Sequence, residues 1–205
     1  MNKVGLTGGI ASGKSMVCEL FRAKGCHIID ADKVAHELIR RGRSCYDPVV
    51  REFGRQVLDV SGEIDRKKLG AIVFDDKVRL ETLNSILHPE VTRAILSDLA
   101  QLESEKQNSR PIVDASLMIE SGFYKCFNSL IVVTCAPRQQ VERLIARNRM
   151  SEEQAMRRIA LQMSLAEKVR FADYVIDNSG TVDRTQEQVN QLFRQLEKSV
   201  WETSQ

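Results

Sequence analysis

Residues 8–15, Gly-Gly-Ile-Ala-Ser-Gly-Lys-Ser, match the pattern G-x-x-x-x-G-K-[ST] in full. A short apolar segment suited to a buried strand precedes the pattern and a helical segment follows it, which is the context that a phosphate-binding loop requires. Glycines let successive backbone N–H groups turn toward phosphate oxygens, and the helix adds the positive end of its dipole. The loop therefore predicts a nucleoside triphosphate site, with Lys14 on the β- and γ-phosphates and Ser15 as a ligand of Mg²⁺. The residues expected to bind the nucleotide are Gly9, Ile10, Ala11, Ser12, Gly13, Lys14, Ser15 and Met16.

Two aspartates, Asp30 and Asp32, follow the second apolar segment, at the sheet edge where ligands bind in open α/β folds. In an extended segment residues i and i+2 point the same way, so both carboxylates are expected to face one site. One could accept the proton of a hydroxyl group, and the other could hold Mg²⁺ through water. The structural alternative is that Asp32 only caps a helix that begins at Lys33, although the nearby phosphate-binding loop favours the functional role. His36, four residues after Asp32, is expected to face the same cleft, although a histidine taken alone is more often an ordinary residue of a helix surface.

Arginine is concentrated between residues 138 and 158. Arg143 and Arg147 are four residues apart on one predicted helix, where like charges repel by roughly 0.2–0.5 kcal/mol unless an anion lies between them. A polyphosphate is such an anion, and arginine is the usual clamp on a phosphoryl group in transfer. A solvated helix face balanced by glutamates is the alternative that stays open. A capping box from Ser151 to Gln154 predicts that a new helix begins there.

The elements that must position these residues are of two kinds. Patterns typical of buried strands occur at residues 3–7, 26–29, 111–115, 130–135 and 174–177. Residues 32–110 instead favour helix almost throughout, with Pro89 expected at the first position of a helix after a turn. An amphipathic helix is expected from Val182 to Val200. We therefore predict an α/β fold of three layers, with a central parallel sheet between helices and a helical insertion after the second strand.

Composition excludes several classes of protein. The 30 Lys and Arg nearly balance the 28 Asp and Glu, which argues against a strongly basic nucleic-acid-binding protein. Aromatic residues make up 5%, which argues against an all-β sandwich and against a base-stacking platform. The five cysteines form no C-x-x-C pair, and no apolar run is long enough to cross a membrane. We expect a cytoplasmic protein with mostly buried, reduced thiols that binds neither nucleic acid nor membrane.

In their order along the chain, these motifs resemble those of bacterial dephospho-CoA kinases, a family of P-loop kinases of the nucleotide-kinase group. The resemblance runs from Val4 to about Gly180. The P-loop itself is generic, whereas the ordered set of the other motifs is specific to this family. The stretches that carry the resemblance are residues 4–10, Asp30–Asp32 with His36, 62–66, 73–74, 83–89, 140–144, Arg158-Ile159 with Gln162, and 172–180.

The resemblance implies phosphorylation of the 3′-hydroxyl of dephospho-CoA by ATP with Mg²⁺, giving CoA and ADP in the last step of coenzyme A biosynthesis. It implies a core of residues 1–32, 111–140 and 170–205, a helical acceptor-binding region at 33–110, and a lid at 141–169. The catalytic residues would be Asp32 as the base, Lys14 and Arg143, with Arg147 of the lid approaching the phosphates or the ATP base. The acceptor would contact Asp30, Asp32, His36, Arg66, Phe74, His88 and Glu120.

Taken without the resemblance, some of these positions have simpler explanations. Asp65, Arg66 and Glu120 are unpaired charges beside apolar segments, and they are more typical of structural or solvated groups. Two stretches also depart from the family pattern. Ser116 stands where the family usually has proline, and Arg147-Asn148-Arg149 stands where it usually has Arg-Asp-Gly. The second departure adds charge to the lid and removes a flexible residue.

Three other functions compete with this interpretation. The first is another small-molecule P-loop kinase, acting on a nucleoside monophosphate or a sugar. The second is a GTPase switch, which needs an Asn-Lys-x-Asp motif that residues 177–180 do not supply. The third is an inactive scaffold, which the intact Lys14, Ser15 and Asp32 argue against. The sequence leaves open whether the protein is a monomer or a homo-oligomer.

Overall fold

The computed structural model describes residues 2–73, 76–105 and 109–201, which form two compact units. Unit 1 consists of Met1–Asp30 and Leu102–Gln205, and unit 2 is Ala31–Gln101. The chain therefore leaves unit 1 after its second strand and returns to it within one long helix, α5 (Lys77–Glu105).

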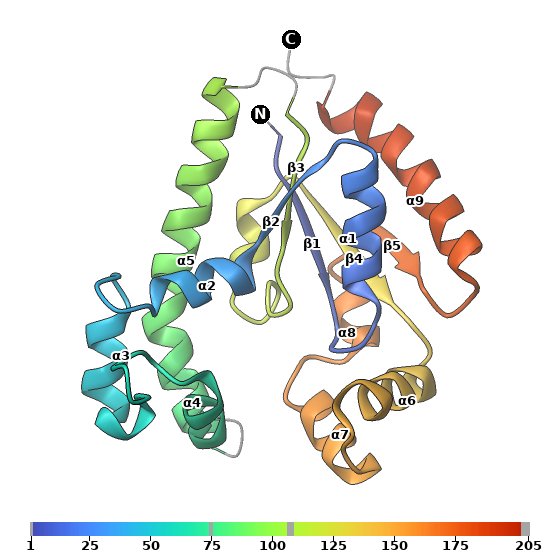
Figure 1. Cartoon of the computed structure of the whole chain (residues 1–205). Helices are drawn as coiled ribbons and strands as arrows, with labels where there is room; N and C mark the ends of the chain where they lie inside the picture. Colours follow the sequence, from blue (N-terminus) through green and yellow to red (C-terminus); the bar gives the residue numbers. More distant parts are fainter. Residues whose placement is uncertain (1, 74–75, 106–108, 202–205) are drawn as a thin grey trace. The chain divides into compact units, whose positions relative to one another are not determined.

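Unit 1 is built on a five-stranded sheet (Figure 1). Every pair of neighbouring strands is parallel, and the spatial order is β2-β3-β1-β4-β5. The central strands β1 and β4 are mostly apolar, and all their residues except the last one of β4 are buried, as expected when both faces of a sheet are covered. The predicted α/β fold with a central parallel sheet is thereby confirmed. The strands are β1 (Val4–Gly8), β2 (His27–Asp30), β3 (Pro111–Asp114), β4 (Ser129–Thr134) and β5 (Tyr174–Asp177).

Side chains alternate between the two faces of β1 and so join two layers to the sheet. Val4 and Leu6 enter a core cluster with Phe21 and Leu192, from two of the helices. A side chain at Gly5 would meet Met118 and other groups that follow β3, on the opposite face. The helices of unit 1 other than the end of α5 are α1 (Lys14–Ala23), α6 (Pro137–Asn148), α7 (Glu152–Ala160), α8 (Leu165–Val169) and α9 (Val182–Leu196), with short helical turns at Phe123–Cys126 and Glu197–Trp201.

Unit 2 is helical and has a hydrophobic core of its own. Cys45, Val49, Phe53 and Val57 are buried together with Leu69 and other apolar side chains. The only extended pairing in the described part of this unit is an isolated bridge between Leu58 and Ile64, which closes the turn at residues 59–62. Besides α5, the helices are α2 (Ala31–Leu38), α3 (Tyr46–Phe53), a short turn at Arg55–Val57, and α4 (Arg66–Val73).

Two local predictions, and the structural alternative given for Asp32, are wrong. Helix α2 begins at Ala31, directly after β2, so Asp32 lies in its first turn and does not cap a helix that starts at Lys33. The alternation argument for Asp30 and Asp32 fails for the same reason, because the segment between them is not extended. Pro89 lies inside α5 rather than at a helix start. Proline normally ends a helix, but α5 keeps apolar side chains buried on both sides of Pro89, and this packing outweighs the local preference.

Two other expectations about the chain, the mostly buried cysteines and the capping box, agree with the structure. The cysteines are free, and all except Cys126 are buried. The predicted capping box is present, with Ser151 and Gln154 exchanging side chain-to-backbone hydrogen bonds at the start of α7. None of the helices in the described residues is long and apolar enough to cross a membrane.

Candidate active site

The phosphate-binding loop connects the end of β1 to the start of α1. The Ser12 N–H donates to the Gly9 carbonyl at 3.1 Å, which closes a tight turn. Ala11 and Gly13 have left-handed backbone, with φ of 60° and 93°. Lys14 and Ser15 are the first residues of α1, where backbone N–H groups have no acceptor within the helix. The loop and the helix N-terminus together form the arrangement that binds phosphate.

Gly13 cannot be replaced without moving its neighbours. A Cβ at this position would lie 1.7 Å from Nδ2 of Asn178. We predict that Gly13→Ala weakens ADP binding by more than about tenfold, because the left-handed backbone and the overlap both displace the loop. Calorimetric titration with ADP measures this.

Gly25 supplies the matched control for that substitution. Its φ is also positive, at 83°, but no atom lies within 4 Å of a Cβ placed there. Gly25→Ala should cost about 1 kcal/mol of unfolding free energy from backbone strain and leave ADP affinity unchanged. Equal ADP affinities for Gly13→Ala and Gly25→Ala would contradict the role given to Gly13.

Lys14 forms an ion pair with Asp114, the last residue of β3, and their side chains are only 13% and 10% exposed. The strand register pairs Asp114 with Asp30 of β2, so two carboxylates lie at the carboxyl ends of neighbouring strands. Burial, the charge of Asp114 and a hydrogen bond to its carboxylate raise the pKa of the Cys18 thiol, which therefore stays protonated. Sequence reasoning did not select Asp114, because only the strand order shows that it lies beside β1.

The oxygen groups here suit magnesium. Ser15, Asp30 and Asp114 offer a hydroxyl and two carboxylates, the hard donors that Mg²⁺ prefers. In the described ranges no group of three or more His, Cys, Asp or Glu side chains could hold a metal ion by itself. The residues therefore fit a Mg²⁺ ion whose shell is completed by nucleotide phosphates and water, as is usual in kinases.

Arg143 and Arg147 lie on α6 as predicted, but they have different partners. Arg143 donates from one Nη to the Asn178 carbonyl at 2.9 Å and from the other to the Ser12 carbonyl at 3.5 Å. The Asn178 side chain donates to the same Ser12 oxygen at 2.9 Å. Arg147 is exposed, and its Nε donates to Oδ1 of Asn148 at 3.0 Å. Arg143 is thus directed at the phosphate-binding loop.

Arg149, which stands where the family usually has glycine, ends α6. Its φ is 52°, and its N–H donates to the Ile145 carbonyl at 2.8 Å, so an arginine adopts the left-handed conformation that glycine favours at this position. We predict that Arg149→Gly is more stable to unfolding than Arg149→Ala by about 1 kcal/mol. Both substitutions remove the same charge, and denaturant titration compares them. Equal stabilities would contradict backbone strain at this residue.

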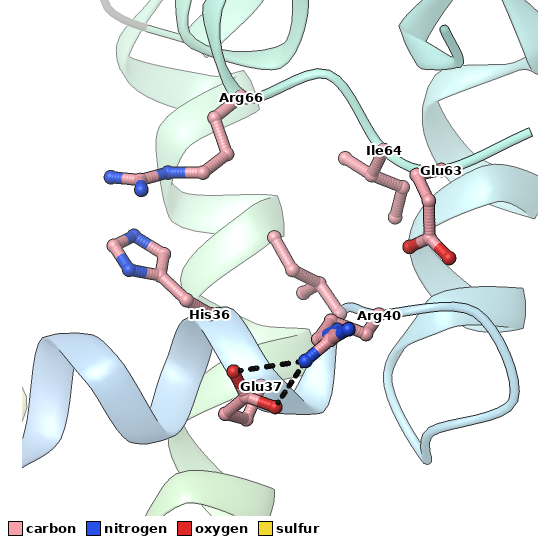
Figure 2. Close-up of a pocket in the computed structure, with 7 residues that line it drawn as sticks. His36, Glu37, Arg40, Glu63, Ile64 and Arg66 are labelled. Atoms are coloured by element: carbon pink, nitrogen blue, oxygen red, sulfur yellow. Dashed lines mark hydrogen bonds and ion pairs between the residues drawn. The ribbon is translucent and has the colours of Figure 1, made fainter. Parts of the chain in front are cut away.

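In unit 2, His36 and Arg66 line one pocket (Figure 2) of about 220 Å³. His36 comes from α2 and Arg66 is the first residue of α4, and Figure 2 shows the imidazole and the guanidinium on the same side of the pocket. Glu37 pairs with Arg40 at 3.1 Å at the pocket wall. Asp65 is not unpaired, since its Oδ1 caps α4 by accepting from the Lys67 N–H at 2.8 Å. The carboxylates of Glu37 and Glu63 also line the pocket, so only the part formed by His36 and Arg66 suits an anionic ligand.

The other expected acceptor residues are not brought to that pocket by the described structure. His88 is half-buried within α5, and burial lowers its pKa. Glu120 belongs to unit 1, and the expectation that it is unpaired is wrong. It forms an ion pair with the fully buried Lys168 at 2.8 Å and accepts from the Met163 N–H at 3.0 Å. Phe74 lies outside the described residues.

Lys168 is a buried charge that sequence reasoning missed. Besides Glu120, its Nζ donates to the Ser116 carbonyl at 2.7 Å. Burial lowers its pKa, while the hydrogen bond and charge of Glu120 oppose that shift. A lysine in a short amphipathic segment gave no signal of burial, because its partners are 48 and 52 residues away.

The P-loop is common to many families, and comparison with known proteins shows the one to which this chain is similar. The family model described as dephospho-CoA kinase matches residues 2–184. The curated dephospho-CoA kinase of Aquifex aeolicus is 43% identical over 197 residues, 96% of this chain and 98% of that protein. The solved dephospho-CoA kinase from Campylobacter jejuni has a TM-score of 0.71 at 29% identity, covering 96% of this chain and 98% of that chain.

A more distant likeness concerns the fold alone. The solved shikimate kinase from Bacteroides thetaiotaomicron has a TM-score of 0.52 at 15% identity, covering 96% of this chain and 98% of that one. This supports the P-loop kinase fold and says nothing of the acceptor. The family model and the curated relatives, by contrast, confirm the resemblance found in the motifs. The chain belongs to the dephospho-CoA kinase family.

Proposed function

We propose that this protein transfers the γ-phosphoryl group of ATP to the 3′-hydroxyl of dephospho-CoA, giving CoA and ADP. The observation that carries the proposal is the family match over residues 2–184 of a chain whose phosphate-binding loop is complete. The match matters most for the acceptor, because the loop alone suits any nucleoside triphosphate. The Lys14–Asp114 pair beside that loop supports phosphoryl transfer at this sheet edge.

For the nucleotide, the proposed contacts are the loop residues from Gly9 to Met16. Lys14 would exchange Asp114 for the β- and γ-phosphates, and Arg143 would extend the positive charge that the transferring group requires. Ser15, with Asp30 or Asp114 through water, would hold Mg²⁺, which when bound neutralises charge on the phosphates. Arg147 on the exposed side of α6 is proposed as a second contact to ATP.

For the acceptor, Asp32 is the proposed base. Its carboxylate would orient the 3′-hydroxyl and take its proton as the oxygen attacks the γ-phosphorus. The pocket of His36 and Arg66 would bind the diphosphate of dephospho-CoA, since both side chains can donate to phosphate oxygens. Phe74, His88, Glu120 and Asp30 remain proposed acceptor contacts, although the partners of Glu120 favour a role in holding Lys168.

We also infer that the protein works in the cytoplasm, as a monomer or a homo-oligomer, without nucleic-acid or membrane partners. Its free cysteines suit a reducing compartment.

A panel of acceptors tests the proposed reaction. Purified protein with ATP and Mg²⁺ is given dephospho-CoA, a nucleoside monophosphate, a sugar or shikimate, and ADP release is followed. We expect acceptor-dependent ADP release with dephospho-CoA and with none of the other acceptors. Release with another acceptor and none with dephospho-CoA would overturn the proposal in favour of a different small-molecule kinase.

A further inference from the structure

Two glutamine side chains hold the backbone of one loop residue, Ile10. Nε2 of Gln140 donates to the Ile10 carbonyl at 2.7 Å, and the Ile10 N–H donates to Oε1 of Gln162 at 2.8 Å. Gln140 is buried, with 6% of its surface exposed. The fit is close, because a Cβ on Gly9 would lie 2.7 Å from the same Nε2 atom. Both polar groups of the Ile10 backbone are therefore used by side chains.

The two glutamines come from the two ends of one segment. Gln140 lies in the first turn of α6, and Gln162 follows the end of α7 by two residues. The helices α6 and α7 pack against each other (Figure 1), so the segment from one glutamine to the other is a single packed hairpin. A displacement of this hairpin must move or break at least one of the two bonds to Ile10.

Ile10 stands directly before the loop residues that turn toward phosphate. Its own N–H donates to Gln162, whereas Ala11 and Gly13, which follow, adopt the left-handed conformations that shape the loop. We infer that Gln140 and Gln162 form a clamp on Ile10 that positions the phosphate-binding loop and ties its shape to the α6–α7 hairpin. Both glutamines are positioning residues. This role depends on the proposed function in one respect only, namely that the loop is the nucleotide site.

The test is a double-mutant cycle in which ADP affinity is measured by calorimetry. Gln140→Leu and Gln162→Leu should each weaken ADP binding about tenfold, the size of one lost hydrogen bond. The ADP affinity of the double variant should be lower than that of the more impaired single variant by less than about threefold. Loss of either hydrogen bond already frees the same residue, Ile10, so the second loss adds little. ADP binding does not depend on the acceptor, so this result stands apart from the test with dephospho-CoA.

A second pair of variants separates the hydrogen bonds from general disruption. Gln140→Glu and Gln162→Glu add the same charge on either side of Ile10, but only Gln162→Glu keeps the acceptor that the Ile10 N–H needs. The Gln140→Glu variant should therefore bind ADP more weakly than the Gln162→Glu variant, by about fivefold or more. This pair decides the matter if a leucine variant fails to fold.

Gln154→Leu is the control within the same hairpin. Its amide caps the start of α7, accepting from Ser151, and does not bond to the loop, so ADP affinity should be unchanged. Wild-type affinity in folded Gln140→Leu and Gln162→Leu would overturn the clamp. Additive effects of the two leucine changes, or equal affinities of the two glutamate variants, would overturn it as well.

Discussion

Asp32→Asn is expected to lower kcat by about 10²–10⁴-fold while ADP affinity stays within about twofold of the wild-type value. Asparagine keeps the size of the side chain but cannot take a proton from the acceptor hydroxyl. Single-turnover kinetics with dephospho-CoA, alongside ADP titration, measures both quantities. A wild-type rate for this variant would exclude Asp32 as the base.

Asp47→Asn is the matched control for Asp32→Asn. Both aspartates lie in the first turn of an eight-residue helix of unit 2, where a negative charge interacts favourably with the helix dipole. Each substitution should cost about 0.3–1 kcal/mol of unfolding free energy for that reason. Only Asp32→Asn should change kcat. An equal loss of kcat in both variants would mean that helix stability, and not proton transfer, explains the effect.

Lys14→Met is expected to weaken nucleotide binding by about 100-fold and to lower kcat by at least as much. The same change leaves the Asp114 carboxylate, which is only 10% exposed, without its cation. Breaking a largely buried ion pair from one side costs about 3 kcal/mol of stability. Denaturant titration and ADP calorimetry follow the two effects separately.

The double variant Lys14→Met/Asp114→Asn distinguishes the structural part of that loss from the functional part. Removing both charges should recover most of the stability, because no uncompensated carboxylate remains. Nucleotide affinity and kcat should stay low, since the phosphates still lack Lys14. Recovery of activity together with stability would contradict the role of Lys14 at the phosphates.

The sequence predicts those features of the fold and the site that neighbouring residues determine. The phosphate-binding loop, the strands and the capping box at Ser151 rest on neighbouring residues, and all are present in the structure. Pro89 was misassigned because burial of the apolar residues around it in α5 outweighs the proline's local effect. Asp32 was expected in an extended segment but lies in helix α2, because β2 passes into α2 without a connecting residue.

The parts of the candidate site that the sequence did not reveal depend on distant partners. Asp114 lies 100 residues from Lys14, and Lys168 lies 48 residues from Glu120. The hydrogen bonds from Gln140 and to Gln162 span 130 and 152 residues. No periodicity or spacing encodes such pairs, and the strand order must be known before they can be inferred. The two expected acceptor residues that do share a pocket, His36 and Arg66, are nearer along the chain.

The central claim, phosphoryl transfer to the 3′-hydroxyl of dephospho-CoA, is tested most directly by the product. The protein is incubated with ATP, Mg²⁺ and dephospho-CoA, and phosphorus NMR locates the new phosphate, with CoA as a control acceptor that lacks a free 3′-hydroxyl. We predict one new phosphomonoester, on the ribose 3′-oxygen, formed in step with ADP, and no ADP release with CoA. A phosphate at any other position, or ADP release that is the same with CoA, would contradict the account.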